Sequence, residues 1–195
     1  MNIWTITHNN FLVKFMCMKK LILLSLFIPI LFGCNKSNKN INEYELIKNW
    51  AKIPNDYVLG NPTGIALKSN QNLVVFHRGS RSWQVPMPKE KIVEDTFVEL
   101  DKVSGKIIKS WGSNMFIMPH GLEIDAKDNI WVTDVALHQV IKYDSSGKEL
   151  MVLGQENERG NDSIHFNLPT DIAVSKNGSF YVSDGYGNSL SLIHI

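Results

Sequence analysis

The chain contains little cysteine: Cys17 and Cys34 are the two cysteines among its 195 residues. Both precede the part that is predicted to fold, which excludes a disulfide framework or a thiolate metal site there. An excess of charge of one sign is also lacking, because 20 Lys and Arg residues balance 19 Asp and Glu residues to a net charge of +1. Neither a basic stripe nor an acidic tail is present, so nucleic acid is not expected as a partner.

Long hydrophobic runs are lacking as well. The apolar run over residues 21–32 is 12 residues long, which is shorter than the ~20 residues that a membrane-spanning helix needs. The basic residues Lys19 and Lys20 precede it, and the sequence LFGC ending at Cys34 follows. This pattern resembles a bacterial lipoprotein signal, in which Cys34 would be lipidated; a plain secretory signal that happens to end in cysteine is the alternative.

The N-terminal region is therefore expected to have three parts. Residues 1–17 are interpreted as an upstream extension, residues 18–34 as the lipoprotein signal peptide, and the polar residues 35–50 as a tether. Acyl chains on Cys34 would hold the protein on a membrane, since each buried methylene contributes ~0.8 kcal/mol. The expected location is the bacterial cell envelope, facing the periplasm or the exterior.

An internal repeat dominates the rest of the chain. Its most visible copies are PTGIAL at 62–67, PHGLEI at 119–124 and PTDIAV at 169–174, whose first prolines are 57 and 50 residues apart. A second strand follows each copy, as LVVF at 73–76, IWVT at 130–133 and FYVS at 180–183. A further strand is repeated at 105–112 and 147–154, and residues 140–142 predict another in the second copy.

Self-similarity near this period, with about four short strands in each unit, is typical of the blades of a β-propeller. The predicted fold class is therefore all-β, a partial β-propeller over residues 51–195 with three blades, of which the third is incomplete. Propellers close with 4–8 blades, so we expect the chain to be a fragment that is inactive and poorly soluble alone, because open sheet edges recruit other chains. The segment 57–60 resembles the end of a fourth strand, which in closed propellers usually completes the last blade.

Departures from the repeat indicate candidate site residues. The turn before the inner strand carries Thr63 and Thr170 in two copies but His120 in the middle one. Arg78 and Tyr186 follow the second strands of the first and third copies. In a propeller these turns can open on the same face, so the three side chains are expected to converge on one axial pocket.

Several motifs resemble the peptidyl-α-hydroxyglycine α-amidating lyase family, and the looser blade pattern resembles NHL repeats. They are FHRG at 76–79, PHGL at 119–122, WVTDVALHQV at 131–140, PTD at 169–171 and VSDGYGNS at 182–189. The resemblance covers residues 65–189 and corresponds to the first half of a six-bladed propeller. It implies a lyase that releases a peptide amide and glyoxylate, acting on a small-molecule or peptide substrate.

The resemblance also implies roles for individual residues. His120 matches a histidine that binds zinc, while Ile65 and Leu122 match positions whose backbone carbonyls hold a structural calcium. Arg78 and Tyr186 match an active-site arginine and tyrosine. The chemistry suits these types, because zinc is a Lewis acid for the substrate hydroxyl and a nearby guanidinium favours the phenolate that would act as the base. One histidine does not complete a zinc site.

Alternatives remain open at each position. His120 can instead be a turn residue bonded to backbone, Arg78 can pair with Glu94 or Asp95, and Tyr186 can be a packing aromatic. Trp83, in the loop over residues 80–95, either covers the pocket or only packs. At the level of function, the alternative is a non-catalytic, membrane-anchored NHL propeller that binds a partner, since fold alone does not imply function. A lactonase-like propeller is disfavoured, because it would need acidic residues at the axial positions.

Overall fold

The computed structural model describes residues 45–189. The chain divides into two units, Met1–Glu45 and Leu46–Ile195, and all the helices and strands described here belong to the second. The predicted lipidation site Cys34 and the predicted signal peptide lie outside the described residues. No helix within residues 45–189 is long and apolar enough to span a bilayer.

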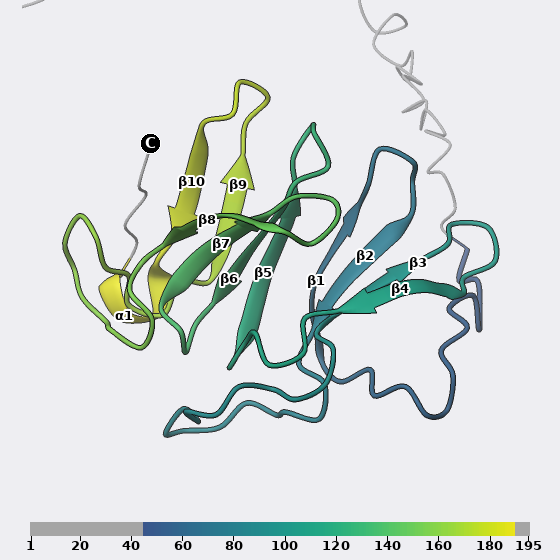
Figure 1. Ribbon diagram of the computed structural model, residues 1–195, viewed down its shortest axis with the longest axis horizontal. Coiled ribbons are helices and arrows are strands. Elements are labelled where there is room, and N and C mark those ends of the chain that lie inside the picture. Colours follow the sequence, from purple (N-terminus) through teal and green to yellow (C-terminus); the bar gives the residue numbers. More distant parts are fainter. Residues whose placement is uncertain (1–44, 190–195) are drawn as a thin grey trace, which may run out of the picture. The chain divides into compact units, whose positions relative to one another are not determined.

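Within residues 45–189, ten strands form three antiparallel sheets, and one short helix follows the last strand (Figure 1). The first sheet has the order β1 (Pro62–Leu67), β2 (Leu73–His77), β3 (Phe97–Leu100) and β4 (Ile107–Trp111). The second has the order β5 (Pro119–Ile124), β6 (Ile130–Asp134), β7 (Gln139–Tyr143) and β8 (Glu149–Leu153). The third pairs β9 (Asp171–Val174) with β10 (Phe180–Ser183), and α1 (Gly185–Asn188) follows.

The sheets are arranged as successive blades. The inner strand β1 lies beside β5, and β5 lies beside β9 (Figure 1). Gly64 allows the first approach, because a Cβ at this position would lie 2.5 Å from Leu122 Cβ. Gly121 allows the second, since its Cβ would lie 2.8 Å from the carbonyl oxygen of Thr170. The described residues do not close into a ring, and the prediction of an all-β, partial β-propeller is confirmed.

The hydrophobic cores lie between blades as well as within them. β-Branched and aromatic residues, which suit a pleated buried surface, line both faces of the central strands β2 and β6. One cluster contains buried residues of the first two sheets. Within the first sheet the Phe97 ring is stacked between those of Phe76 and Trp111, at centroid distances of 4.5 and 4.0 Å, and Tyr143 of the second sheet lies edge-on to Phe97 and Trp111. A second cluster joins the second and third sheets, where Trp131 contacts Phe180. Each sheet is therefore stabilised by its neighbour.

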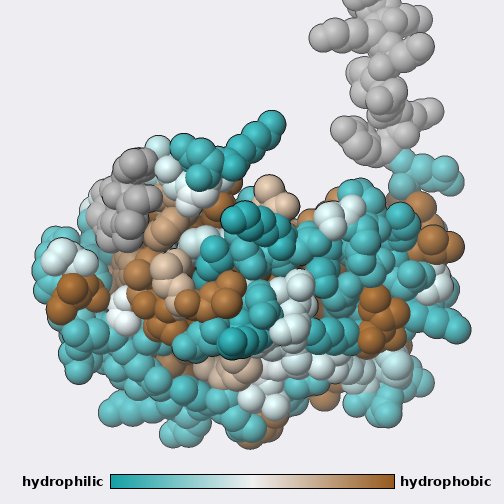
Figure 2. Space-filling view, turned by 45° about the horizontal axis from the view of Figure 1, so that its top comes forward, coloured by the Kyte–Doolittle hydropathy of each residue, from teal (hydrophilic) through white to brown (hydrophobic). Residues whose placement is uncertain are grey.

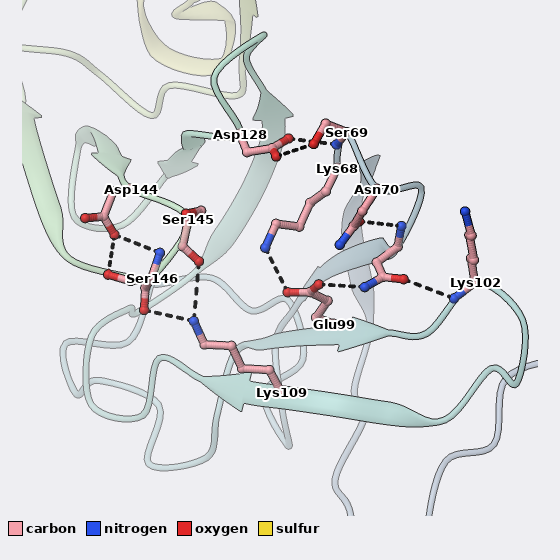
Figure 3. A network of polar contacts seen from close by, with 11 residues as sticks. Lys68, Ser69, Asn70, Glu99, Lys102, Lys109, Asp128, Asp144, Ser145 and Ser146 are labelled. Atoms are coloured by element: carbon pink, nitrogen blue, oxygen red, sulfur yellow. Dashed lines mark hydrogen bonds and ion pairs between the residues drawn. The ribbon is translucent and has the colours of Figure 1, made fainter.

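Polar contacts at hairpin turns of the second sheet also connect it to the first sheet (Figure 3). The backbone N–H and hydroxyl of Ser69 donate to the Asp128 carboxylate at 2.7 and 2.6 Å. Lys109 Nζ donates to the carbonyl oxygen of Ser146 at 2.8 Å. On the face shown in Figure 2, hydrophilic residues predominate, and the hydrophobic side chains form separate groups.

Three details differ from the sequence-based expectations. The segment 57–60 forms no strand; Tyr57 and Leu59 instead pack with Trp50 and Ile53 against a small core cluster of the first sheet. Burial of these four apolar side chains accounts for that placement. The residues after β10 form the short helix α1 rather than an open loop, and β3, which was not identified in the sequence, completes the first sheet.

Candidate functional site

His120 lies on the inner strand β5 and has a defined tautomer. Its Nδ1 lies 2.7 Å from the carbonyl oxygen of Thr170. A carbonyl only accepts hydrogen bonds, so Nδ1 carries the proton and donates it, and Nε2 keeps its lone pair. Burial, supported by the charge of Arg78, lowers the pKa of His120, although the bond to Thr170 and the charge of Asp171 act in the opposite direction. The imidazole is therefore neutral near pH 7, with Nε2 as an acceptor.

Tyr186 forms a hydrogen bond with the unprotonated Nε2 of His120. Its hydroxyl, on α1, lies 3.1 Å from His120 Nε2, and the two ring planes are nearly perpendicular at a centroid distance of 5.3 Å. Because Nε2 is the acceptor, the Tyr186 hydroxyl donates the hydrogen bond. The side chain is 57% exposed, so it reaches out of the fold and does not pack in a core. Tyr186 is therefore not an aromatic residue packed in the core of a blade, which was the alternative interpretation of its sequence position.

Arg78 approaches the same place from the first blade. Its Nε donates to the carbonyl oxygen of Pro119 at 3.0 Å, and its Cζ lies 5.3 Å from the centre of the Trp83 ring. Burial lowers the pKa of Arg78, while the charges of Tyr186 and Asp134 act to raise it. Asp95, one alternative partner, accepts a hydrogen bond from Ser110 instead, at 2.6 Å.

Trp83 joins these side chains. It lies in the loop between β2 and β3, which extends beneath the sheets at the end of the molecule where α1 lies (Figure 1). The indole makes edge-on contacts with Tyr186 at a centroid distance of 5.8 Å and with His120 at 6.4 Å. The three sequence-predicted residues and Trp83 thus form one group from three blades. The sequence left the role of Trp83 undecided, since no repeat copy aligns with its loop.

A hollow of about 680 Å³ opens beside this group. Its lining includes His120 and Tyr186, and it also includes Ile65 and Leu122, the two positions expected to hold calcium through backbone carbonyls. Polar groups from the third blade, Thr170 and Ser183 among them, complete the wall. The inner strands of all three blades therefore contribute to one hollow that is large enough for a small ligand.

His120 fits a zinc ligand in one respect. Metal-bound histidines almost always donate their other ring N–H to a carbonyl, carboxylate or water, as Nδ1 of His120 does toward Thr170. Thr133 Oγ1 donates to that same carbonyl at 3.0 Å and so supports it, a contact that the sequence did not reveal. Within residues 45–189, no group of three or more His, Cys, Asp or Glu side chains is arranged to hold a metal ion.

The repeat position just before Arg78 has a structural role. His77, Asp134 and Asp184 occupy it in the three blades. Asp134 accepts four backbone N–H groups, from residues 117, 118, 136 and 137, at 2.8–2.9 Å. Asp184 accepts the backbone N–H of Asn167, and His77 accepts that of Gly79. These side chains bind backbone N–H groups of the loops that carry the site, so the position has a structural role in all three blades.

Known proteins resemble the chain along most of its described length. The NHL repeat family matches residues 166–190. The chain is 45% identical over 150 residues to peptidylglycine alpha-amidating monooxygenase of Rattus norvegicus, covering 70% of this chain and 15% of that protein. It is 40% identical over 155 residues to peptidyl-alpha-hydroxyglycine alpha-amidating lyase 2 of Drosophila melanogaster, covering 74% of this chain and 38% of that protein.

Among solved structures, hydrazine synthase of Kuenenia stuttgartiensis aligns over 72% of this chain and 32% of its own, with a TM-score of 0.45 and 13% identity. The chain spans well under half the length of each of the two relatives named above. On the strength of those relatives and its NHL repeat, the chain belongs to the peptidyl-α-hydroxyglycine α-amidating lyase family.

Proposed function

We propose that the protein is a lyase that cleaves a peptidyl-α-hydroxyglycine, or a related carbinolamide, into an amide and glyoxylate. The observation that carries the proposal is the contact between Tyr186 and His120 Nε2 at 3.1 Å, with the Arg78 guanidinium in the same group. These side chains come from three blades, and His120 and Tyr186 line one hollow. The names of the relatives support the same reaction class.

The proposed reaction moves one proton. Tyr186, as the phenolate, takes the proton of the substrate hydroxyl; the carbon–oxygen bond becomes the carbonyl of glyoxylate as the carbon–nitrogen bond breaks. The leaving amide nitrogen then receives the proton from the Tyr186 phenol, which restores the phenolate. The positive charge of Arg78 would stabilise the phenolate, and a base within hydrogen-bond reach of the hydroxyl is the requirement for this step.

The same proposal assigns the metal sites. His120 Nε2 would be one zinc ligand, with further ligands from outside the described residues, and the zinc would act as a Lewis acid for the hydroxyl oxygen. Since Nε2 has one lone pair, the Tyr186 hydroxyl would then lose His120 as its acceptor. The backbone carbonyls of Ile65 and Leu122 would hold calcium, which prefers oxygen ligands.

The proposal also includes a location. Lipidation of Cys34 would anchor the protein to a membrane of the bacterial cell envelope, where the hollow could receive peptide or small-molecule substrates. Mass spectrometry of the mature N-terminus tests this part, because a diacylglyceryl group on Cys34 adds a defined mass. A mature chain that begins elsewhere and lacks the lipid would contradict the anchor.

The decisive experiment measures glyoxylate release from an N-acyl-α-hydroxyglycine by the whole protein loaded with zinc. The change Tyr186→Phe should lower kcat by a factor of roughly 10²–10⁴, the usual contribution of a general base. Tyr181→Phe, the same chemical change on β10 outside the residues that line the hollow, is the matched control and should keep the wild-type rate.

Two results would separate the alternatives. If Tyr186→Phe keeps wild-type turnover, the base assignment is wrong. If the zinc-loaded protein binds the peptide without releasing glyoxylate, the protein is the non-catalytic binding propeller instead. Zinc content supplies a further readout, since His120→Ala should lower the zinc retained after dialysis whatever the activity.

A further inference from the structure

Trp83 is the side chain that the other three members of the group share. Its ring contacts Tyr186 and His120 edge-on, and its face lies under the Arg78 guanidinium. The indole is 42% exposed, so it contributes little to a hydrophobic core. Its contacts are directed at the candidate site.

The loop that carries Trp83 is attached firmly at its base. Arg81 Nη1 donates to the carbonyl oxygens of Glu90 at 2.6 Å and Ile117 at 3.1 Å, which ties the two sides of the loop together and to the second blade. The backbone N–H of Ile92 donates to the carbonyl oxygen of Phe116 at 2.7 Å, and the Ile92 side chain is buried. Trp83 is therefore presented from a fixed base.

The contact with the Trp83 indole helps the Arg78 side chain to keep one orientation. A long guanidinium side chain has several rotatable bonds, and the bond from Nε to Pro119 fixes a single point of it. The indole face under the guanidinium limits its rotation, since Arg stacks favourably on aromatic faces. Two contacts, one polar and one aromatic, therefore restrain the guanidinium within the group that includes Tyr186.

We propose that Trp83 is a positioning residue, whose indole holds the Arg78 guanidinium beside Tyr186 for the reaction. This inference rests on the proposed lyase function. It assigns to the loop between β2 and β3 a part in catalysis through Arg78, without direct contact between Trp83 and the reacting atoms.

The kinetic test compares three variants of the whole protein. Trp83→Leu, which keeps apolar bulk but removes the aromatic face, should lower kcat about tenfold or more and leave KM within about threefold. Trp83→Phe should restore most of the rate. Val85→Ala, at an 83% exposed position of the same loop, should behave as wild type. A rise in KM at unchanged kcat in Trp83→Leu would overturn the inference, because it would indicate a substrate contact instead.

A second readout does not depend on activity. In ¹⁵N-arginine-labelled protein, the Nε–H signal of Arg78, identified by its loss in Arg78→Lys, should be shifted upfield by the indole ring. In Trp83→Leu this signal should move downfield and exchange faster with solvent, while the backbone amide spectrum stays that of a folded protein. An unchanged Arg78 signal in Trp83→Leu would overturn the positioning role, whereas a shifted signal in a protein without glyoxylate release would overturn the proposed lyase function alone.

Discussion

At the scale of single residues, one position of the repeat is occupied by histidine in one blade and by aspartate in the other two, with the same structural role. His77 in the first blade stands where Asp134 and Asp184 stand in the others, and it is fully buried. Gly79 N–H donates to His77 Nδ1 at 3.1 Å, so Nε2 carries the proton and donates to the Tyr57 hydroxyl at 3.0 Å. A carboxylate can be satisfied by backbone N–H groups alone, whereas a histidine must remain neutral to make this pair of contacts.

This arrangement predicts a dependence of stability on pH. Burial lowers the pKa of His77 to about 4, although the charges of Asp95 and Glu94 act against the shift. The unfolded chain, with a His pKa of ~6.5, binds the proton first as the pH falls. The contribution of His77 is therefore complete above pH ~6.5 and is lost between pH ~6.5 and ~4, in total roughly 3 kcal/mol.

Urea unfolding at several pH values measures this effect. Wild type should lose more stability between pH ~6.5 and ~4 than His77→Gln, which cannot titrate. His165→Gln is the contrasting control, because the hydrogen bond that His165 Nδ1 donates to the Asp162 carboxylate raises the pKa of His165, and its pH effect therefore has the opposite sign. Equal pH profiles for wild type and His77→Gln would contradict the prediction.

Three of the four residues grouped at the candidate site could be predicted from the sequence. Arg78, His120 and Tyr186 were found because each differs from its repeat equivalents, and the repeat itself implied that their turns share a face. Trp83 lies in a loop without a repeat copy, so its distance to the group followed from no pattern. The roles of these residues remain predictions, while their proximity is a property of the fold.

At the scale of elements, the sequence predicted nine of the ten strands within residues 45–189, eight from the repeat and β7 from its local pattern, but missed β3. Alternation and β-branched residues identify a strand when turn residues bound it closely, as Asp125 and Asn129 do between β5 and β6. In the first blade a long irregular loop separates β2 from Phe97–Leu100, and the four residues of β3 are buried throughout, so they show no alternation. β3 is recognised as a strand only in the folded protein, where it pairs with β2 and β4.

The approach of neighbouring inner strands predicts a cost for one added methyl group. In Gly64→Ala the new Cβ would lie 2.5 Å from Leu122 Cβ and 2.9 Å from Leu122 N, so β1 and β5 would have to separate. Overpacking of this kind costs about 1–3 kcal/mol. The free energy of unfolding from denaturant titration should fall by that amount.

The matched control for this change is Gly185→Ala. A Cβ there would meet no atom closer than 3.7 Å, and the residue begins α1, where alanine is favourable. Its stability should stay near that of wild type. If Gly64→Ala were as stable as Gly185→Ala, the close packing of β1 on β5 would be disproved.

At the scale of the whole described unit, stability passes from blade to blade. The first and second sheets share the cluster around Phe97, and the second and third share the cluster around Phe180. Proteins whose units contact mainly their neighbours have stabilities that are approximately sums of unit and interface contributions. Within residues 45–189 the third sheet has two strands and one shared cluster, so it should open at lower free energy than the second.

Hydrogen exchange of the 195-residue chain, read by mass spectrometry, tests this order. Amides of β9 and β10 should exchange faster than those of β6 and β7, which are paired on both sides. Phe180→Ala, a core truncation worth about 3–5 kcal/mol, should accelerate exchange in the third sheet and leave β2 and β3 protected. Phe97→Ala, of the same size, removes a ring that stacks on Phe76 in the first sheet and lies edge-on to Tyr143 of the second, so it should accelerate the first two sheets together. If amide exchange became faster by the same factor in every sheet of both variants, the blades would unfold as one cooperative unit, because a local change at one interface would then destabilise all three sheets equally.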